Sequence, residues 1–238
     1  GGLGNWFHGS VRGGEANKGA NLASQPEANE LQRYAASTTN AAVLAKWQGC
    51  YEGIRRVHQL MELIDLCPDP ALTAAERTEL KAQARFLRAL WYFDLRRCFG
   101  NVPWIDETMD AATALQVPNN VEIYPQIEAD LAFAIANLPA TQPVAGRPNL
   151  WSAKGYLGKV QLTQARYADA LATLNDVATN GKSPSGAALA LLPSYGSVFS
   201  AAQPDHAEVL FGTQGSANAP VPAGSSGPVG CCGFFQPS

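Results

Sequence analysis

Long apolar runs, basic clusters and a disulfide pattern are all missing from this 238-residue sequence. No run of about 18 apolar residues occurs, so the sequence predicts no membrane-spanning helix. The net charge is −3, and the pairs Arg55–Arg56 and Arg96–Arg97 stand alone within helical patterns, so nothing favours a nucleic-acid partner. Five cysteines, an odd number, define no disulfide framework.

The sequence patterns of common catalytic, nucleotide and metal sites are also absent. There is no Gly-x-Ser-x-Gly elbow, phosphate-binding loop, His-Glu-x-x-His pair or calcium-binding loop, and the three histidines are scattered. The carboxylate pairs Glu62/Asp65 and Glu128/Asp130 are better explained as solvated helix faces than as glycosidase acids, because glycosidase chemistry needs a set separation in space. We therefore expect no enzyme, no cofactor and no metal site.

What the sequence does contain is a set of helical patterns. Hydrophobic residues make up 46% of the chain and charged residues 16%, as in a globular protein. Apolar residues recur at three- and four-residue steps, which is typical of amphipathic helices. The patterns predict helices over about 41–66, 74–99, 124–138, 150–163 and 167–180.

Several helix ends have recognisable signals. Thr73 and Glu76 form a capping box, with a hydroxyl at the N-cap and a carboxylate three residues later. Gly100 is expected as a left-handed cap, and Gly181 is expected to cap the last helix. Beyond residue 182, Val198–Phe199 and 208–212 look like short strands or turns.

The helix pair 150–180 matches a degenerate tetratricopeptide repeat. With Leu157–Gly158 placed at the Leu-Gly step, Ala170, Leu174 and Val177 fall where the second helix needs a small residue and two apolar residues. The predicted fold is mainly α and tetratricopeptide-like, with loop-rich regions at both ends. We expect one partial domain, with a loop-rich segment at 1–40, helices over 41–181 and an irregular segment over 182–238.

Several sequence blocks, in order, resemble the SusD/RagB family of Bacteroidetes nutrient-uptake lipoproteins. The strongest runs from Lys81 to Pro103 and is similar to the family pattern "EARFLRAxxYFxLxxxFGxVP", with Gln83 in place of Glu. The stretch from Trp47 to His58 resembles a family helix that usually carries Asn where His58 stands. Further similar blocks bring the resemblance to most of residues 6–212, and the chain is expected to be an internal fragment.

This resemblance implies a function in nutrient capture. Such proteins lie over a SusC-type TonB-dependent transporter at the cell surface, held in the outer membrane by a lipid anchor that this chain lacks. The implied ligand is a glycan or oligosaccharide, or a peptide in some branches. One alternative is a tetratricopeptide scaffold that binds a protein or peptide, and a further alternative, glycoside hydrolysis, has no supporting motif.

Candidate ligand-binding residues are those that could combine an aromatic face with hydrogen-bonding groups. Trp47, Trp91 and Trp151 fall in helical patterns and are expected in the core, whereas residues at helix edges or in loops are better sugar platforms. The resemblance implies that the loop over residues 9–21 contributes to the site, although the aromatic residue often found there is missing and a solvated loop is the alternative. The candidates are Trp6, Arg12, Glu15, Asn17, Asn21 and Trp104.

Arg85 and Arg88 lie three residues apart on one predicted helix. They could bind a ligand carboxylate through paired hydrogen bonds. The alternative, which we favour, is an interhelical salt bridge or a contact with a neighbouring loop.

Overall fold

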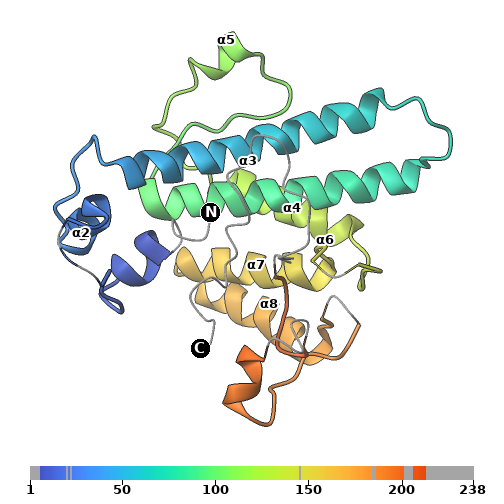
Figure 1. Ribbon diagram of the computed structural model, residues 1–238. Coiled ribbons are helices and arrows are strands. Elements are labelled where there is room, and N and C mark those ends of the chain that lie inside the picture. Colours follow the sequence, from blue (N-terminus) through green and yellow to red (C-terminus); the bar gives the residue numbers. More distant parts are fainter. Residues whose placement is uncertain are drawn as a thin grey trace. The chain divides into compact units, whose positions relative to one another are not determined.

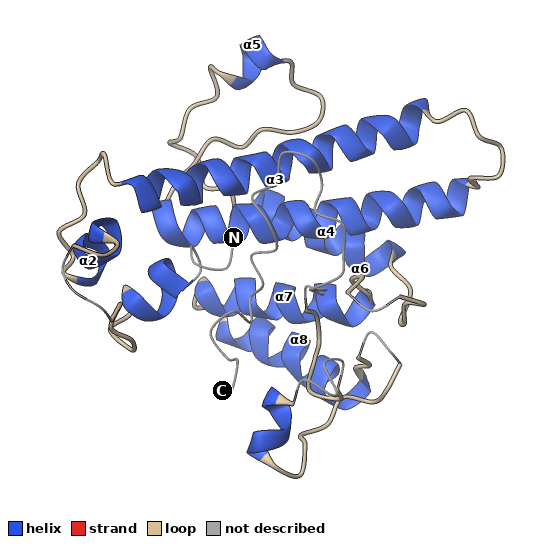
Figure 2. Ribbon diagram, viewed as in Figure 1, coloured by secondary structure: helices blue, strands red, loops and turns tan. Residues whose placement is uncertain are grey.

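The computed structural model describes residues 6–19, 21, 23–144, 146–183, 186–200 and 206–212. The chain divides into two compact units, one that contains the residues up to Glu52 and a second that comprises Gly53–Thr213. Within the described residues the secondary structure is helical (Figure 2), and the extended pairing is limited to an isolated bridge between Lys182 and Ala188. The predicted fold class is therefore confirmed. The adjacent Cys231 and Cys232 lie outside the described residues.

The N-terminal unit contains two short helices where the sequence predicts mainly loops. These are the π-helix η1 (Phe7–Val11) and α2 (Pro26–Gln32), which has proline in its first turn. Their apolar sides form a small core of Phe7, Val11, Ala28 and Leu31.

Asn40 joins this small core to the next helix, α3 (Ala41–Leu66). Its Oδ1 accepts hydrogen bonds from the backbone N–H groups of Ala42 and Val43 at 3.0 and 3.1 Å, as a helix cap does. Its Nδ2 donates to the Glu27 carbonyl and to Glu30 Oε2 at 3.0 and 2.8 Å. One buried amide therefore connects α2 to the start of α3.

In the second unit, the later part of α3 packs against α4 (Ala74–Phe99), and Val57, Met61 and Ala84 lie in the contact. The capping box of Thr73 and Glu76 is present, as predicted. Gly100 has the expected positive φ of 75°, but its ψ of −136° lies outside the left-handed region, so the predicted cap geometry is wrong there. Gly181 caps the last helix, as predicted, and its N–H donates to the Val177 carbonyl.

Trp91 on α4 departs from the core position expected for it, since 37% of the residue is exposed. Its indole lies over Gly53 of α3, and a Cβ added to Gly53 would come within 2.5 Å of the ring. The helices approach closely enough for the ring to cover the glycine backbone. The outer edge of the ring is then left in solvent.

The remaining helices form a stacked array (Figure 1). α6 (Tyr124–Asn137) packs on α4, α7 (Leu150–Thr163) packs on α6, and α8 (Tyr167–Asn180) packs on α7. The starts of all three agree with the predicted ranges, and α6 ends one residue before the expected Leu138. Asn149 caps α7 and is fully buried, with its Nδ2 donating to the carbonyls of Ala140 and Lys182 at 3.2 Å each.

The tetratricopeptide reading of α7 and α8 agrees with their packing. Ala170 and Val177 are buried, and Leu174 lies so close to Gly158 that an added Cβ would be 2.6 Å from its Cγ. The Leu-Gly step is therefore the point where the two helices approach. A larger side chain at Gly158 would push them apart.

The two segments expected as short strands or turns contain no strand, and a third feature was not anticipated. Tyr195–Phe199 forms a short 3₁₀ helix, η2, whereas 206–212 contains a turn at residues 207–208, in agreement with the turn alternative. The latter segment packs on α7 instead, where Leu210 contacts Gly155 and its carbonyl accepts a hydrogen bond from Ser152 Oγ at 2.7 Å. The connection after α4 contains the one-turn helix α5 (Ala111–Ala114).

Among the described helices, none combines the length and hydropathy that crossing a membrane would require.

Replacing Gly158 by alanine is expected to destabilise the protein by about 1–3 kcal/mol, because the new methyl group overpacks the contact with Leu174. Gly49→Ala on α3 is the matched control. It adds the same methyl group where nothing lies within 4 Å, so it is expected to raise stability by about 0.5–1 kcal/mol. Urea unfolding of both variants measures the two effects. Equal effects would contradict the close approach of α7 and α8.

Candidate functional site

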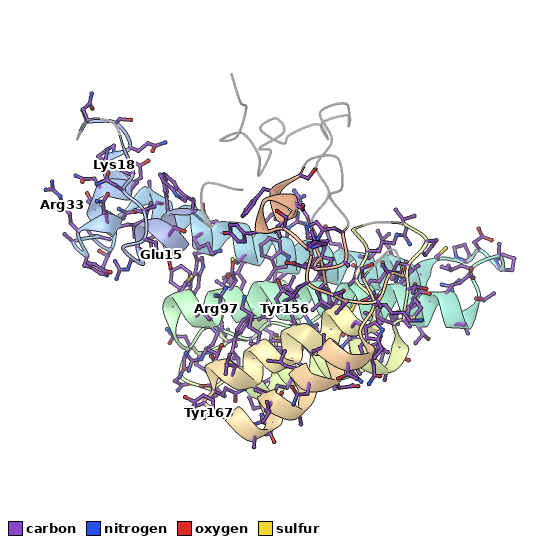
Figure 3. All side chains as sticks on the ribbon, turned by 90° about the horizontal axis from the view of Figure 1, so that it is seen from below. Glu15, Lys18, Arg33, Arg97, Tyr156 and Tyr167 are labelled. Carbon is purple, nitrogen blue, oxygen red and sulfur yellow. The ribbon has the colours of Figure 1, made fainter. Side chains whose placement is uncertain are left out.

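The six predicted ligand-binding residues divide between the two units. Trp6, Arg12, Glu15, Asn17 and Asn21 belong to the N-terminal unit, and Trp104 belongs to the second unit. Figure 3 labels Glu15 and Lys18 on the segment that follows η1, and Arg33 at the end of α2. Each group is described below within its own unit.

The loop that follows η1 is folded by its own polar side chains. Asn17 Oδ1 accepts a hydrogen bond from the Gly19 N–H at 2.9 Å, and Asn21 Oδ1 accepts from Ala23 and Ser24 at 3.1 and 3.0 Å. These are the local turns that asparagine side chains favour. Lys18 Nζ donates to the carbonyls of Asn21, at 2.7 Å, and Ser24.

The side-chain amides of Asn17 and Asn21 therefore stabilise the turns of this loop. Both residues are nevertheless exposed, as is Glu15, so their remaining polar atoms face solvent. The backbone N–H of Lys18 donates to Gln32 Oε1 at 3.2 Å, which connects the loop to α2. The loop is thus a shaped polar surface attached to a helix.

Trp6 is half-buried and packs against the small core of the N-terminal unit. Its ring centroid lies 5.4 Å from that of Phe7, in a tilted arrangement. Part of the indole is therefore covered by this packing, and only the rest of the ring is accessible to a ligand.

Arg12 lies beside an aromatic residue that the sequence interpretation missed. The Arg12 guanidinium carbon is 4.7 Å from the ring centroid of Tyr34, and the Tyr34 hydroxyl donates to the Arg12 carbonyl at 2.7 Å. Tyr34 remains 66% exposed, and a guanidinium can cover only one of the two ring faces. The structure therefore supplies the exposed aromatic side chain that the 9–21 loop itself lacks.

Tyr34 has an unusual backbone conformation. Its φ of +56° lies in the left-handed region that non-glycine residues seldom occupy. Such a conformation costs of the order of 1 kcal/mol, and an outlier of this kind often marks a functional position. No local pattern in the sequence could have paired Tyr34 with Arg12, since 22 residues separate them.

Trp104 is half-buried and packs against other side chains. It stacks on Tyr92 of α4 with ring centroids 4.1 Å apart, and the Arg88 guanidinium lies over its ring at 5.2 Å. Tyr92 also holds the neighbouring backbone, because its hydroxyl donates to the Ile105 carbonyl at 2.8 Å and accepts from the Ile105 N–H at 2.7 Å. Trp104 thus helps to fix the segment after α4 onto that helix.

The preferred interpretation of Arg85 and Arg88, an interhelical salt bridge, is confirmed. Asp130 of α6 accepts from Arg85 Nε at 2.6 Å and from Arg88 Nε and Nη2 at 2.7 and 2.8 Å. The Arg88 side chain is 4% exposed and that of Asp130 1%. Arg88 also pairs with Glu107 of the following segment and lies 3.5 Å from His58 Nε2.

Ionisation of this cluster follows from burial and neighbouring charge. Burial lowers the pKa of His58, and the positive charge of Arg88 lowers it further. For Arg88, burial acts to lower the pKa, but the hydrogen bonds and charges of Asp130 and Glu107 outweigh it and raise the pKa overall. The pKa of Glu107 is lowered, because its hydrogen bonds and the charge of Arg88 outweigh burial.

Within this cluster the positive charges of Arg85 and Arg88 are balanced by the carboxylates of Asp130 and Glu107. The guanidinium of Arg88 is engaged by two protein carboxylates, so it is not placed to bind a ligand anion. Of the four carboxylates considered as glycosidase acids, Asp130 lies in this cluster, Asp65 pairs with Lys81, and Glu128 pairs with Arg166. No group of His, Cys, Asp and Glu suited to a metal ion occurs in the part of the chain that the structure describes.

The stacked helices α4, α6, α7 and α8 place the protein in the class of helical-repeat proteins. Comparison of the sequence with known families gives a more specific assignment within that class. The sequence model of a SusD-like family, described as starch-binding and associating with the outer membrane, matches residues 13–162. The chain belongs to this SusD-like family.

Individual relatives agree with this assignment. A SusD-like protein P2 of Formosa agariphila is 32% identical over 142 residues, which are 58% of this chain and 27% of that protein. A SusD-like protein of Bacteroides ovatus is 30% identical over 121 residues, 50% of this chain and 22% of that one. The chain thus matches about a quarter of the length of these relatives.

Solved structures show the same fold. A structure described as a laminarin-binding SusD-like protein has a TM-score of 0.70 and 27% identity, covering 81% of this chain and 42% of that one. A SusD superfamily protein from Bacteroides vulgatus has a TM-score of 0.69 at 19% identity, covering 79% of this chain and 39% of that one.

Replacing Asp130 by asparagine is expected to destabilise the second unit by about 3 kcal/mol or more, because the buried Arg88 loses its main counter-charge. Asp169→Asn is the matched control. It removes a carboxylate from the exposed pair with Arg166, so the change in unfolding free energy is expected to be too small to resolve. Guanidinium unfolding of both variants measures the difference, and similar midpoints would contradict the structural role of Asp130.

A pH dependence follows from His58. Its pKa is lower in the folded state than the ordinary 6.5, so below about pH 6.5 the unfolded chain binds more protons. Stability is therefore expected to fall as the pH drops through that range, and His58→Asn is expected to reduce the fall. Thermal unfolding of both proteins at pH 7.5 and pH 5.5 gives the comparison. A variant that loses as much stability as the parent would remove His58 as the cause.

Proposed function

We propose that this chain forms part of a cell-surface protein that binds oligosaccharides and delivers them to a SusC-type TonB-dependent transporter of the outer membrane. Membership of a family described as starch-binding supports glycan capture, and the association with the outer membrane in the same description supports the proposed location. One solved relative is described as laminarin-binding, so a β-glucan is the first ligand to test. The proposed role is binding rather than catalysis.

The exposed ring of Tyr34 and the adjacent guanidinium of Arg12, here called the Tyr34–Arg12 surface, support a particular location for the sugar site. A sugar ring presents C–H groups to an aromatic face and hydroxyls to amides and charged groups. Tyr34 supplies the aromatic side chain, and the exposed Glu15, Asn17 and Asn21 of the loop after η1 supply polar groups in the same unit. Arg12 adds guanidinium donors beside the ring.

Trp6 and Trp104 remain candidates, but their packing makes them poor test positions. Removing either ring would disturb folded contacts, with Phe7 in one case and with Tyr92 and Arg88 in the other. A loss of binding after such a change would not separate ligand contact from misfolding. Tyr34 is exposed, so its removal tests contact more directly.

A second candidate function is binding of a protein or peptide without affinity for carbohydrate. Tyr167 and Leu171 of α8 support it, because both are exposed on the last helix of the stacked array. Helical-repeat proteins often use such surfaces for partner binding.

Tyr34→Ala is expected to weaken binding of laminarin about tenfold, equivalent to roughly 1.4 kcal/mol, by removing the aromatic face. Tyr167→Ala is the matched control, since Tyr167 is 67% exposed compared with 66% for Tyr34. Affinity gel electrophoresis with laminarin, xyloglucan and starch measures retardation of the parent protein and both variants. Loss of retardation for Tyr34→Ala alone supports the proposed site.

Two other outcomes are informative. Retardation of the parent and of both variants alike would place glycan binding away from Tyr34. No retardation of the parent by any of the glycans would favour the protein- or peptide-binding alternative.

A further inference from the structure

Four arginines of α4 lie over aromatic rings, and each of them also pairs with a carboxylate of the protein. They are Arg85 over Phe133 with Asp130, Arg88 over Trp104 with Asp130 and Glu107, Arg96 over Tyr124 with Glu122, and Arg97 over Phe93 with Asp94. In each case the guanidinium contacts a ring while the protein itself supplies the counter-charge.

Arg12 of the N-terminal unit has the aromatic ring but not the carboxylate. Its guanidinium carbon lies 4.7 Å from the ring centroid of Tyr34, and the residue is half-buried. Within the described part of the chain, no carboxylate forms an ion pair with Arg12, and no protein acceptor takes a hydrogen bond from its guanidinium. Glu15, three residues away in the sequence, is exposed and does not pair with it. A positively charged group with five N–H donors is therefore available to a ligand.

The position of Arg12 is set before any ligand binds. Its backbone N–H donates to the Phe7 carbonyl at 3.1 Å, and its own carbonyl accepts from the Tyr34 hydroxyl at 2.7 Å. Lys18 in the following loop is used differently, since its ammonium donates to two backbone carbonyls of that loop. A guanidinium that is already held beside the ring loses less entropy when it binds a ligand group.

This chemistry favours an anionic sugar over a neutral one. Hydroxyl groups are suited to the exposed amides of Asn17 and Asn21, whereas a guanidinium binds an oxyanion with hydrogen bonds roughly twice as strong as those between neutral groups. Arg33, the residue before Tyr34, is exposed and also has no carboxylate partner among the residues that the structure describes. Two arginines without counter-charges thus belong to the segments that form the Tyr34–Arg12 surface.

We propose that the Tyr34–Arg12 surface binds an anionic oligosaccharide, with one sugar ring against the exposed part of Tyr34 and a carboxylate or sulfate group of the oligosaccharide hydrogen-bonded to Arg12. This inference rests on the proposed glycan-binding function and names the class of glycan. Tyr34, which is 66% exposed, supplies the contact with the sugar C–H groups. Arg12 supplies the counter-charge that the carboxylates of the second unit supply to the arginines of α4.

Affinity gel electrophoresis of the whole protein of which this chain forms part tests the proposal with matched polysaccharides. Polygalacturonate is compared with its neutral methyl ester, and dextran sulfate with neutral dextran. We expect at least one charged polysaccharide to retard the protein at about tenfold lower concentration than its neutral counterpart. The two charged polysaccharides distinguish a carboxylate from a sulfate ligand. The retardation is expected to weaken as salt rises, because the contact is between opposite charges.

Substitutions of Arg12 locate the charge preference. Arg12→Gln is expected to remove most of the difference between charged and neutral polysaccharide, and Arg12→Lys, which keeps the charge, is expected to retain part of it. Lys159→Gln is the matched control, because Lys159 also lies over an aromatic ring, 5.8 Å from the centroid of Tyr156, but belongs to the second unit. It is expected to keep the full preference. Melting temperatures of the variants show whether each is folded.

The outcomes separate this inference from the function on which it rests. Equal binding of charged and neutral polysaccharides, or a preference that Arg12→Gln leaves intact, would overturn the inference and leave glycan capture standing. A charge preference of the parent that does not respond to salt would overturn it without any substitution. Binding to none of these polysaccharides, nor to laminarin, xyloglucan or starch, would overturn both and favour the protein- or peptide-binding alternative.

Discussion

The buried ion pair between Asp130 and the two arginines of α4 is the interaction on which the second unit depends. It connects α4 to α6. The guanidinium of Arg88 also contacts His58 of α3 and Glu107 of the segment after α4, so one side chain of α4 joins α3, α6 and that segment. Ionised groups this deeply buried are tolerated only when each is paired and hydrogen-bonded. The arrangement therefore fixes the spacing of α4 and α6, and with it the base on which α7 and α8 stack.

This use of charge separates structure from recognition. Arg85 and Arg88, which could have bound a ligand anion, are occupied within the protein, and three of the four carboxylates considered as acids, Asp65, Glu128 and Asp130, are paired with basic side chains. The ring of Tyr34 and the polar loop after η1, in the N-terminal unit, are exposed instead. These exposed groups, not the buried charges, form the proposed sugar-binding surface.

Much of the helical framework could be predicted from the sequence, because its signals are local. The capping box at Thr73, the apolar repeats of α6 to α8 and the Leu-Gly step at Gly158 act over a few residues. The failures also have local explanations. Gly100 caps α4 with a ψ outside the left-handed region, Trp91 lies over Gly53 and stays partly exposed, and 195–199 has no sheet to join among the described residues.

The candidate site likewise has features that local sequence signals predict and features that only distant contacts determine. The sequence by itself determined the family resemblance, the polar composition of the 9–21 loop and the preference for a pairing role of Arg85 and Arg88, since each rests on residue type and short spacing. Only the tertiary structure decided that Trp104 is held between Tyr92 and Arg88, and that Tyr34 stands against Arg12. The reason is physical: contacts between residues far apart in sequence depend on how helices and loops pack, and no periodicity along the chain records that geometry.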